Sequence, residues 1–457
     1  GDSFLSSFVN HLGNPITSPY IKENTGCNPQ VACLVWMDTY DDLSNNPGGI
    51  IRPHFTWGGA ADKIEESPKY MPNAYGGKGG IRFYVDPQRI KQGNAVIAIC
   101  DKAPTTNSNA FYQFDAIWSW HIWVTRLDVK EKDKTIEVTA HDPSRKFEFM
   151  PMNLGWCSED GEKIKYYEER VAEIKFSSGG KNETVKIVKK SHIAFTYGNN
   201  PYYQWGRKDP FIAAKKGEAD NNKPWYNYAG VRDGRNPPRL TNDSPDYDSE
   251  RLTTRQALGH LIRHPETWHN PPREWKKDET VTDRDYWRYF SKNESYSNLW
   301  EGRQGKDHTA QTLKTVYDPS PVGYQVCHYN AFSGFTTTGD NTGWEPEWYD
   351  VRTENIMSGN PTEGLYEFYT NPEKNQSIIF PMSSYRDWDS YAYIADTELM
   401  IIGYSWAAGN ARNDDNYAYN FMFSRKDKNG YIRPKDSFYP TDGMPVRPVR
   451  NGSHTGY

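Results

Sequence analysis

The stretch Ile117-Trp-Ser-Trp-His-Ile-Trp-Val-Thr125 decides how this chain folds. Side chains of a β-strand alternate between its two faces. The alternation predicts one face made of Trp118, Trp120, Ile122 and Val124, and an opposite face made of Ser119, His121 and Trp123. Indoles this large need cover on at least one side, so this strand is predicted to lie in a packed sheet.

Shorter apolar runs precede this strand, at residues 31–36, 81–85 and 95–99. Turn-forming residues separate them, most clearly the Gly-rich run at residues 76–80. Short strands divided by frequent turns are typical of antiparallel sheets. We therefore expect an antiparallel β-sandwich over residues 1–130.

Composition bounds the class of protein. The 457 residues include 15% aromatic side chains, too many for a disordered chain. Basic and acidic residues, 54 and 59, are interspersed and give a formal charge of −5, so there is no electrostatic footprint for nucleic acid. The chain has no apolar run near 18 residues, so we expect no transmembrane helix.

The rest of the chain repeats the short-strand pattern, with two additions. Residues 171–176 and 184–195 flank a turn at 177–182 and predict a hairpin whose second arm is basic, with Lys186, Lys189 and Lys190. Residues 253–263 carry apolar side chains at helical spacing and predict one amphipathic helix. Further strands are expected at 378–380, 399–404, 417–424 and 446–449. The predicted class is mostly β (α+β), with one or two helices.

Cysteine and histidine spacing does not indicate a metal site. The five cysteines include no paired CxxC, and Cys27 and Cys33 are close enough in sequence that a bridge between them stays open. His260 and His264 are four residues apart, as helical zinc ligands would be, and His269 follows. However, HExxH is absent and Pro265 ends the helix, which favours histidines at a solvated helix end. We expect no metal and no cofactor.

Carboxylates and thiols do not form a recognisable catalytic motif. Acidic pairs occur at Asp41 and Asp42, at Asp246 and Asp248, and at Asp414 and Asp415. Such pairs can bind calcium or flank a glycosidic bond, but solvated loops are the favoured interpretation. No nucleophile elbow or phosphate loop is present, and nothing local marks Cys157 or Cys327 as activated. We expect no enzyme activity.

A ring-rich loop is the strongest candidate for a contact surface. Trp344-Glu-Pro-Glu-Trp-Tyr349 places three aromatic rings in a segment rich in Gly and Asn. Exposed rings stack on sugars or act as anchors in protein interfaces. The alternative, that these rings pin a long loop to the domain, is equally open.

Several strings occur in an order that resembles a known family. They are Gly93-Asn-Ala-Val-Ile-Ala-Ile99, Trp118-Ser-Trp-His-Ile-Trp-Val-Thr125, Asn153-Leu-Gly155, Tyr203-Gln-Trp-Gly-Arg-Lys-Asp-Pro-Phe211, Tyr317-Asp-Pro-Ser-Pro-Val-Gly-Tyr324, Phe332-Ser-Gly-Phe-Thr-Thr-Thr338, Phe380-Pro-Met382, Tyr385-Arg-Asp-Trp388, Tyr419-Asn-Phe421 and Val446-Arg-Pro-Val-Arg450. The ordered set resembles the fimbrillin-like surface proteins of Bacteroidetes. Their C-terminal part is a "major paralogous domain", similar to the C-type-lectin-like fold shared with formylglycine-generating enzymes.

This resemblance implies a fold and a location. It implies a fimbrillin-like β-sandwich domain over 1–130 and a C-type-lectin-like domain over 131–457, with a hairpin insertion near 160–200. It also implies export, often as a lipoprotein, and display on the outer membrane or a pilus. The sequence departs from the family where Ser320 and Cys327 stand at positions usually Cys and Pro. Because Cys327 has no partner cysteine downstream, we do not expect formylglycine-type chemistry.

The function expected from these observations is non-enzymatic adhesion. A glycan or protein ligand would bind loops of the lectin-like domain, with Trp344, Trp348, Tyr349, Asp414 and Asp415 as candidate ligand-binding residues. One alternative is a structural or accessory pilus subunit assembled with other subunits by strand exchange. A second alternative is a carbohydrate-active hydrolase. We expect an extracellular, cell-surface location.

Overall fold

The computed structural model is mostly β, as expected, with 48% of the described residues in strands. The residues it describes are 9–18, 20–24, 26–39, 67–85, 92–106, 112–125, 127–129, 135–158, 165–167, 170–189, 192–194, 198–212, 225–228, 232–233, 239–240, 254–269, 299–300, 312–341, 365–373, 376–387, 402–410, 417–424 and 431–452.

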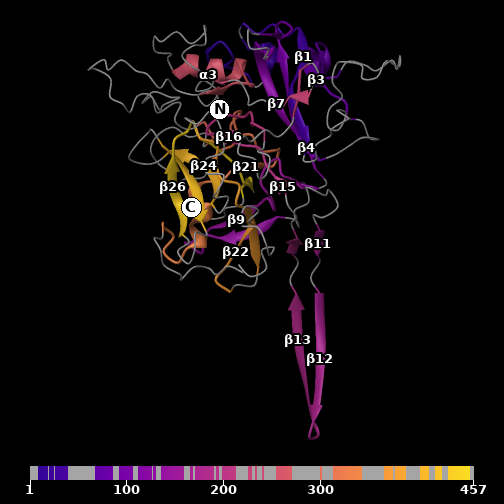
Figure 1. Ribbon diagram of the computed structural model, residues 1–457, viewed down its shortest axis with the longest axis vertical. Helices are drawn as coiled ribbons and strands as arrows, with labels where there is room; N and C mark the ends of the chain where they lie inside the picture. The colour runs from indigo at the N-terminus through magenta and orange to yellow at the C-terminus, as the bar shows by residue number, and fades with distance from the viewer. Residues whose placement is uncertain are drawn as a thin grey trace, which may run out of the picture.

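The N-terminal part is built around a five-stranded sheet of order β18-β17-β1-β4-β7 (Figure 1). Its bounds are β1 (Val31–Thr39), β4 (Gly93–Cys100), β7 (Ala116–Val124), β17 (Trp225–Asn227) and β18 (Arg232–Asp233). Each neighbouring pair is antiparallel. β4 is buried along its whole length, as its apolar run predicts. Strands β17 and β18 lie beyond residue 130, so the sheet contains strands from both sides of the expected domain boundary. The boundary itself stays a prediction.

The alternation expected for β7 is confirmed, with one exception. Trp120, Ile122 and Val124 pack together against the same cluster of apolar side chains. Ser119 points the other way and is buried against Asp209. Trp118 departs from the pattern, because it packs against a different apolar cluster from Trp120. Its ring centroid lies 6.1 Å from that of Tyr317.

The C-terminal part packs several small sheets around a cluster of phenylalanines. Its sheets are β24-β25-β26, β21-β28-β9-β8 and β22-β23. Their bounds are β8 (Ile136–Thr139), β9 (Lys146–Phe149), β21 (Tyr324–Val326), β22 (Leu365–Tyr369), β23 (Ser377–Pro381), β24 (Ile402–Asn410), β25 (Ala418–Ser424), β26 (Tyr431–Phe438) and β28 (Pro448–Arg450). Phe332 stacks on Phe421 with ring centroids 4.7 Å apart. This aromatic core compensates for the chain's modest content of aliphatic side chains.

The predicted hairpin is confirmed, with a longer first strand than expected and a second strand that begins earlier and ends at Lys189. β12 (Arg170–Ser178) pairs with β13 (Lys181–Lys189) along all nine residues of each strand. At its base, β11 (Lys165–Tyr167) pairs with β14 (His192–Ala194) in the same register. The β12–β13 hairpin projects from the body along the long axis of the molecule (Figure 1).

The remaining elements are short. Helix α3 (Thr254–Arg263) matches the predicted helix within one residue. The others are η1 (Ile21–Glu23), α2 (Ala74–Gly77), η5 (Tyr329–Phe335), β2 (Lys69–Met71), β3 (Gly80–Arg82), β5 (Thr105–Thr106), β6 (Tyr112–Gln113), β10 (Cys157–Ser158), β15 (Gly198–Asn199), β16 (Tyr203–Gln204), β19 (Arg239–Leu240), β20 (Trp268–His269) and β27 (Gly443–Met444). Within the described residues, no helix combines the length and apolar character needed to cross a membrane.

The string Tyr203 to Phe211 joins the N-terminal sheet to the C-terminal part. The Tyr203 hydroxyl lies 2.9 Å from Nδ1 of His121 on β7. On the other side, Gln204 Nε2 donates to the carbonyl of Thr441 at 2.6 Å, and the Trp205 indole donates to that of Ala407 at 2.9 Å. A string that is prominent in the sequence is therefore a buried structural connection.

Gly206 and Arg207 within that string behave as their chemistry predicts. Gly206 has φ +82°, and a Cβ there would lie 2.6 Å from a methyl group of Leu299. The Arg207 guanidinium donates to the carbonyls of Thr267 and His264 at 2.7 and 3.1 Å. Glycine permits the close approach, and the planar guanidinium satisfies two backbone carbonyls at once.

Candidate binding surfaces

The ligand-binding residues expected from the sequence lie outside the described residues. These are Trp344, Trp348, Tyr349, Asp414 and Asp415. The other acidic pairs, at 41–42 and at 246 and 248, also lie outside them. The adhesion and hydrolase hypotheses that depend on these residues therefore stay predictions.

The histidines near the end of α3 are packed against their surroundings. His260 is buried, and its ring centroid lies 4.4 Å from that of His264. His264 Nδ1 lies 3.5 Å from a carboxylate oxygen of Glu266, which is also buried. Among the described residues, no group of three His, Cys, Asp or Glu side chains could hold a metal ion.

All five cysteines are free thiols. Cys33 on β1 lies diagonally across the ladder from Cys100 on β4, whereas Cys27 lies 3.7 Å from Nδ1 of His11. The bridge between Cys27 and Cys33 that the sequence left open is not present in the structure.

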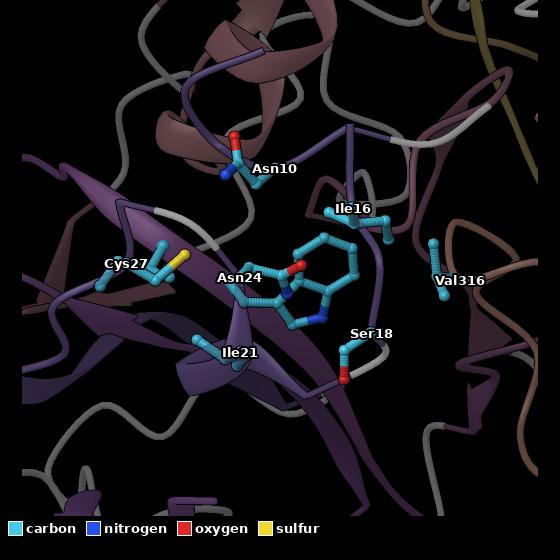
Figure 2. Close-up of a pocket in the computed structure, with 9 residues that line it drawn as sticks. Asn10, Ile16, Ser18, Ile21, Asn24, Cys27 and Val316 are labelled. Atoms are coloured by element: carbon cyan, nitrogen blue, oxygen red, sulfur yellow. The ribbon is translucent and has the colours of Figure 1, made fainter. Parts of the chain in front are cut away.

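A small cavity lies beside the N-terminal sheet (Figure 2). It is lined by Asn10, Ile16, Ser18, Ile21, Asn24, Cys27, Ile117, Trp118 and Val316. Its volume is about 30 Å³, room for roughly two water molecules at 10–15 Å³ each. This cavity is too small for a sugar or a peptide side chain.

Cys27, which lines this cavity, and its neighbour His11 have the residue types of a nucleophile and its base, but their pKa shifts oppose that role. Burial raises the pKa of Cys27 to about 11, so the thiol is protonated at neutral pH. Burial, helped by the charge of Arg263, lowers the pKa of His11. An activated pair needs a thiolate beside an imidazolium, and both shifts oppose that state.

The β12–β13 hairpin is the most extensive exposed apolar feature among the described residues. Pairing along the ladder places ten side chains on one face, called here the apolar face: Arg170, Ala172, Ile174, Phe176, Ser178, Lys181, Glu183, Val185, Ile187 and Lys189. Phe176 is 54% exposed and Ile187 is 50% exposed. Soluble proteins seldom leave an apolar stripe of this length in water, so the apolar face is a candidate contact surface.

A tight turn holds the two strands of the hairpin in register. Gly179 and Gly180 connect them with φ +58° and +77°. A two-residue turn with both central φ angles positive matches the twist of the flanking strands, and glycine adopts it without strain. The turn is shorter than the predicted one at 177–182, because Ser177 and Ser178 continue β12.

The hairpin differs in charge from the rest of the chain. Residues 170–189 contain five basic and two acidic side chains, a formal charge of +3. Because the whole chain carries −5, the remaining residues carry −8. The basic second arm expected from the sequence therefore lies on the element that projects furthest from the body (Figure 1).

A second exposed ring lies on a loop that the sequence marked only as a turn. Tyr75 is 77% exposed and has φ +53°, beside Gly76 and Gly77 with φ +67° and +86°. A bulky residue in the left-handed region is uncommon and carries a conformational cost. The Gly-rich run at 76–80 was the signal for the turn, but nothing in the sequence distinguished Tyr75 from a packed ring.

No protein-family model, no curated protein and no solved structure matches this chain.

Proposed function

We propose that this protein is a non-enzymatic binding protein of the cell surface, and that the β12–β13 hairpin is its contact arm. The observation that supports this proposal is the exposed apolar face on a projecting basic hairpin. An isolated two-stranded hairpin is at best marginally stable in water, and a partner that covers the apolar face would stabilise it. The cell-surface location rests on the family resemblance.

The fimbrillin-like sandwich and the C-type-lectin-like domain belong to the same proposal. In this arrangement the body is a scaffold for two candidate contact features, the hairpin and the ring-rich sequence at 344–349. An exposed apolar hairpin and a sequence rich in aromatic rings both suit a protein that acts by contact. An insertion on a rigid scaffold is also where a family member gains a binding property of its own.

An array of purified glycans and extracellular proteins tests this proposal. The wild-type protein is compared with an apolar-face variant, Ile174→Asp with Phe176→Asp, and with a ring variant in which Trp344, Trp348 and Tyr349 become Ala. Binding lost only in the apolar-face variant supports the hairpin as contact arm, and binding lost only in the ring variant assigns contact to the loop. If the wild-type protein binds nothing on the array, or if both variants bind as the wild type does, the proposal is contradicted.

A structural pilus subunit is the second candidate. It is favoured by the outer edges of β12 and β13, which pair with no other described strand along nine residues. An exposed edge of this length is a template for strand addition from another chain. Strand exchange predicts polymers that survive unheated detergent gels, and purified protein that runs only as a monomer in such gels contradicts this candidate.

A further inference from the structure

Two of the five cysteines lie on neighbouring strands of the N-terminal sheet. Cys33 on β1 is opposite Ala98 of β4, and Cys100 on β4 is opposite Val31 of β1. The two cysteines are therefore two positions apart along one antiparallel ladder. Residues opposite each other, and residues separated by two positions along a strand, share a face of the sheet. Cys33 and Cys100 consequently point to the same side.

The two thiols meet inside the apolar layer on that side. Both side chains belong to one cluster, which also contains Val96 and Phe114, and both are fully buried. The thiols are hydrogen-bonded to each other. Diagonal residues of a ladder are about 7–8 Å apart at Cα, close to the upper limit for a disulfide. The contact between the thiols shows that these two side chains already face each other.

The other three cysteines have different neighbours. Cys327 packs in the phenylalanine cluster. Cys157 Sγ lies 3.4 Å from the side-chain amide of Asn94, and Cys27 Sγ lies 3.7 Å from Nδ1 of His11. The sequence left a bridge between Cys27 and Cys33 open, but the fold brings Cys100 against Cys33.

We propose that Cys33 and Cys100 form a disulfide when the chain folds in the presence of a disulfide oxidant. The bond would link β1 to β4 covalently and close residues 34–99 into a loop. Disulfides form and persist in extracellular proteins, so the proposed surface location supplies a suitable environment. The inference goes beyond the proposed contact role of the hairpin and does not depend on it.

The reaction is thiol–disulfide exchange in two steps. One of the two thiols loses its proton, and its thiolate attacks the oxidant. The S–S bond of the oxidant breaks, one half leaves as a thiolate, and a mixed disulfide remains on the protein. The second cysteine then loses its proton and attacks the protein sulfur of that mixed disulfide, which displaces the other half. The protein gives up two protons and two electrons, and the oxidant takes them up as two thiols.

The folded structure shields the pair from such exchange. Hydrogen bonding with Cys33, together with burial, holds the pKa of Cys100 well above its ordinary value, and the charges of Glu266 and Asp101 act in the same direction. The thiolate is the nucleophile, so the buried pair reacts slowly. Exchange is therefore expected during folding, before the two strands are covered.

The bond should stabilise the folded protein. A cross-link that closes a long loop restricts the unfolded chain, and the two cysteines are far apart in sequence. We expect the oxidised protein to unfold at a higher urea concentration than the reduced protein. We also expect a reductant to open the bond only when the protein is unfolded, because both sulfur atoms are buried.

Refolding of the full chain from urea, with a mixture of oxidised and reduced glutathione, tests the proposal. Free thiols are then counted in denaturant with Ellman's reagent. The wild type should lose two of its five thiols and the mass of two hydrogen atoms. Peptide mapping without reductant should recover one cross-linked species, which contains Cys33 and Cys100.

Single substitutions provide the controls. Cys33→Ala and Cys100→Ala should each keep all of their remaining thiols, and their urea midpoints should be the same with and without the oxidant. Cys157→Ala removes a buried cysteine outside the pair and should still lose two thiols. Circular dichroism shows that each variant is folded before its thiols are counted.

Three outcomes would overturn the proposal. They are five titratable thiols in the refolded wild type, a cross-link that joins any other two cysteines, and an oxidised protein that is no more stable than the reduced one. None of these measurements involves a ligand. The thiol count and the binding array can therefore fail independently of each other.

Discussion

Lys208, Asp209 and Ser119 form a buried polar cluster between the string at 203–211 and β7. Lys208 Nζ lies 2.7 Å from a carboxylate oxygen of Asp209, and the Ser119 hydroxyl donates to the other oxygen at 2.7 Å. Lys208 also donates to the hydroxyl and the carbonyl of Ser119. Burial lowers the pKa of Lys208, and the charge of Asp209 opposes that shift. The cation is tolerated because each of its bonds is made within the protein.

Removing one member of this pair should strongly destabilise the fold. Lys208→Met leaves the Asp209 carboxylate buried without its cation, and we expect a loss of about 3–5 kcal/mol in the free energy of unfolding. Urea titration followed by circular dichroism measures it. The pair of exposed Lys102 and half-buried Asp115, 2.7 Å apart, is the control, and Lys102→Ala should cost at most about 1 kcal/mol because the lysine is in water. Equal losses in the two variants would contradict this account.

His121 gives the stability a dependence on pH. Burial lowers its pKa from 6.5 to about 3 in the folded protein. Below pH 6.5 the unfolded chain gains a proton that the folded chain does not bind, so stability falls with pH from about 6.5 towards 3. This residue should account for about 2 kcal/mol of the loss between pH 7 and pH 5.

Urea titrations of the wild type and of His121→Phe at the two pH values measure the contribution of His121. The variant should lose less stability than the wild type between them. An equal loss in both proteins would show that other groups carry the pH dependence.

At the scale of elements, the hairpin and the phenylalanine cluster should contribute very differently to the stability of the fold. All residues of β12 and β13 are exposed, whereas Phe332, Phe380 and Phe421 are buried and in mutual ring contact. Replacing residues 171–188 with Asn-Gly joins Arg170 to Lys189 through a two-residue turn. We expect this change to alter the free energy of unfolding by less than about 0.5 kcal/mol.

Phe421→Ala is the matched contrast to the hairpin deletion. It creates a cavity in the ring cluster and should cost about 3–5 kcal/mol. Thermal and urea unfolding of the two variants can be compared directly. A hairpin deletion that destabilises the protein as much as the cavity does would mean that the hairpin packs on the body.

At the scale of the whole molecule, the sheet and the C-terminal part should unfold together. The string at 203–211 bonds to His121 and Ser119 on one side and to Thr441 and Ala407 on the other. Neither part can separate without exposing these buried groups. Near- and far-ultraviolet circular dichroism should therefore report one coincident transition in urea, and two separated transitions would contradict this coupling.

The sequence by itself determined the local elements, because strand alternation and helix caps depend on neighbouring residues. The pattern of β7, the helix at α3 and the hairpin were all predicted within a few residues. The apolar side chains at 172–176 and 185–187 gave no indication of their exposure, since the same alternation describes a strand with a buried face.

Only the tertiary structure decided which of these faces the body covers. It also decided that the string at 203–211 is a buried connection, because its bonding partners are up to 237 residues away along the chain. The sequence pattern likewise did not predict that Tyr75 is exposed on its turn or that Trp118 packs against Tyr317. Burial depends on which distant segment lies alongside, and a pattern of neighbouring residues does not contain that information.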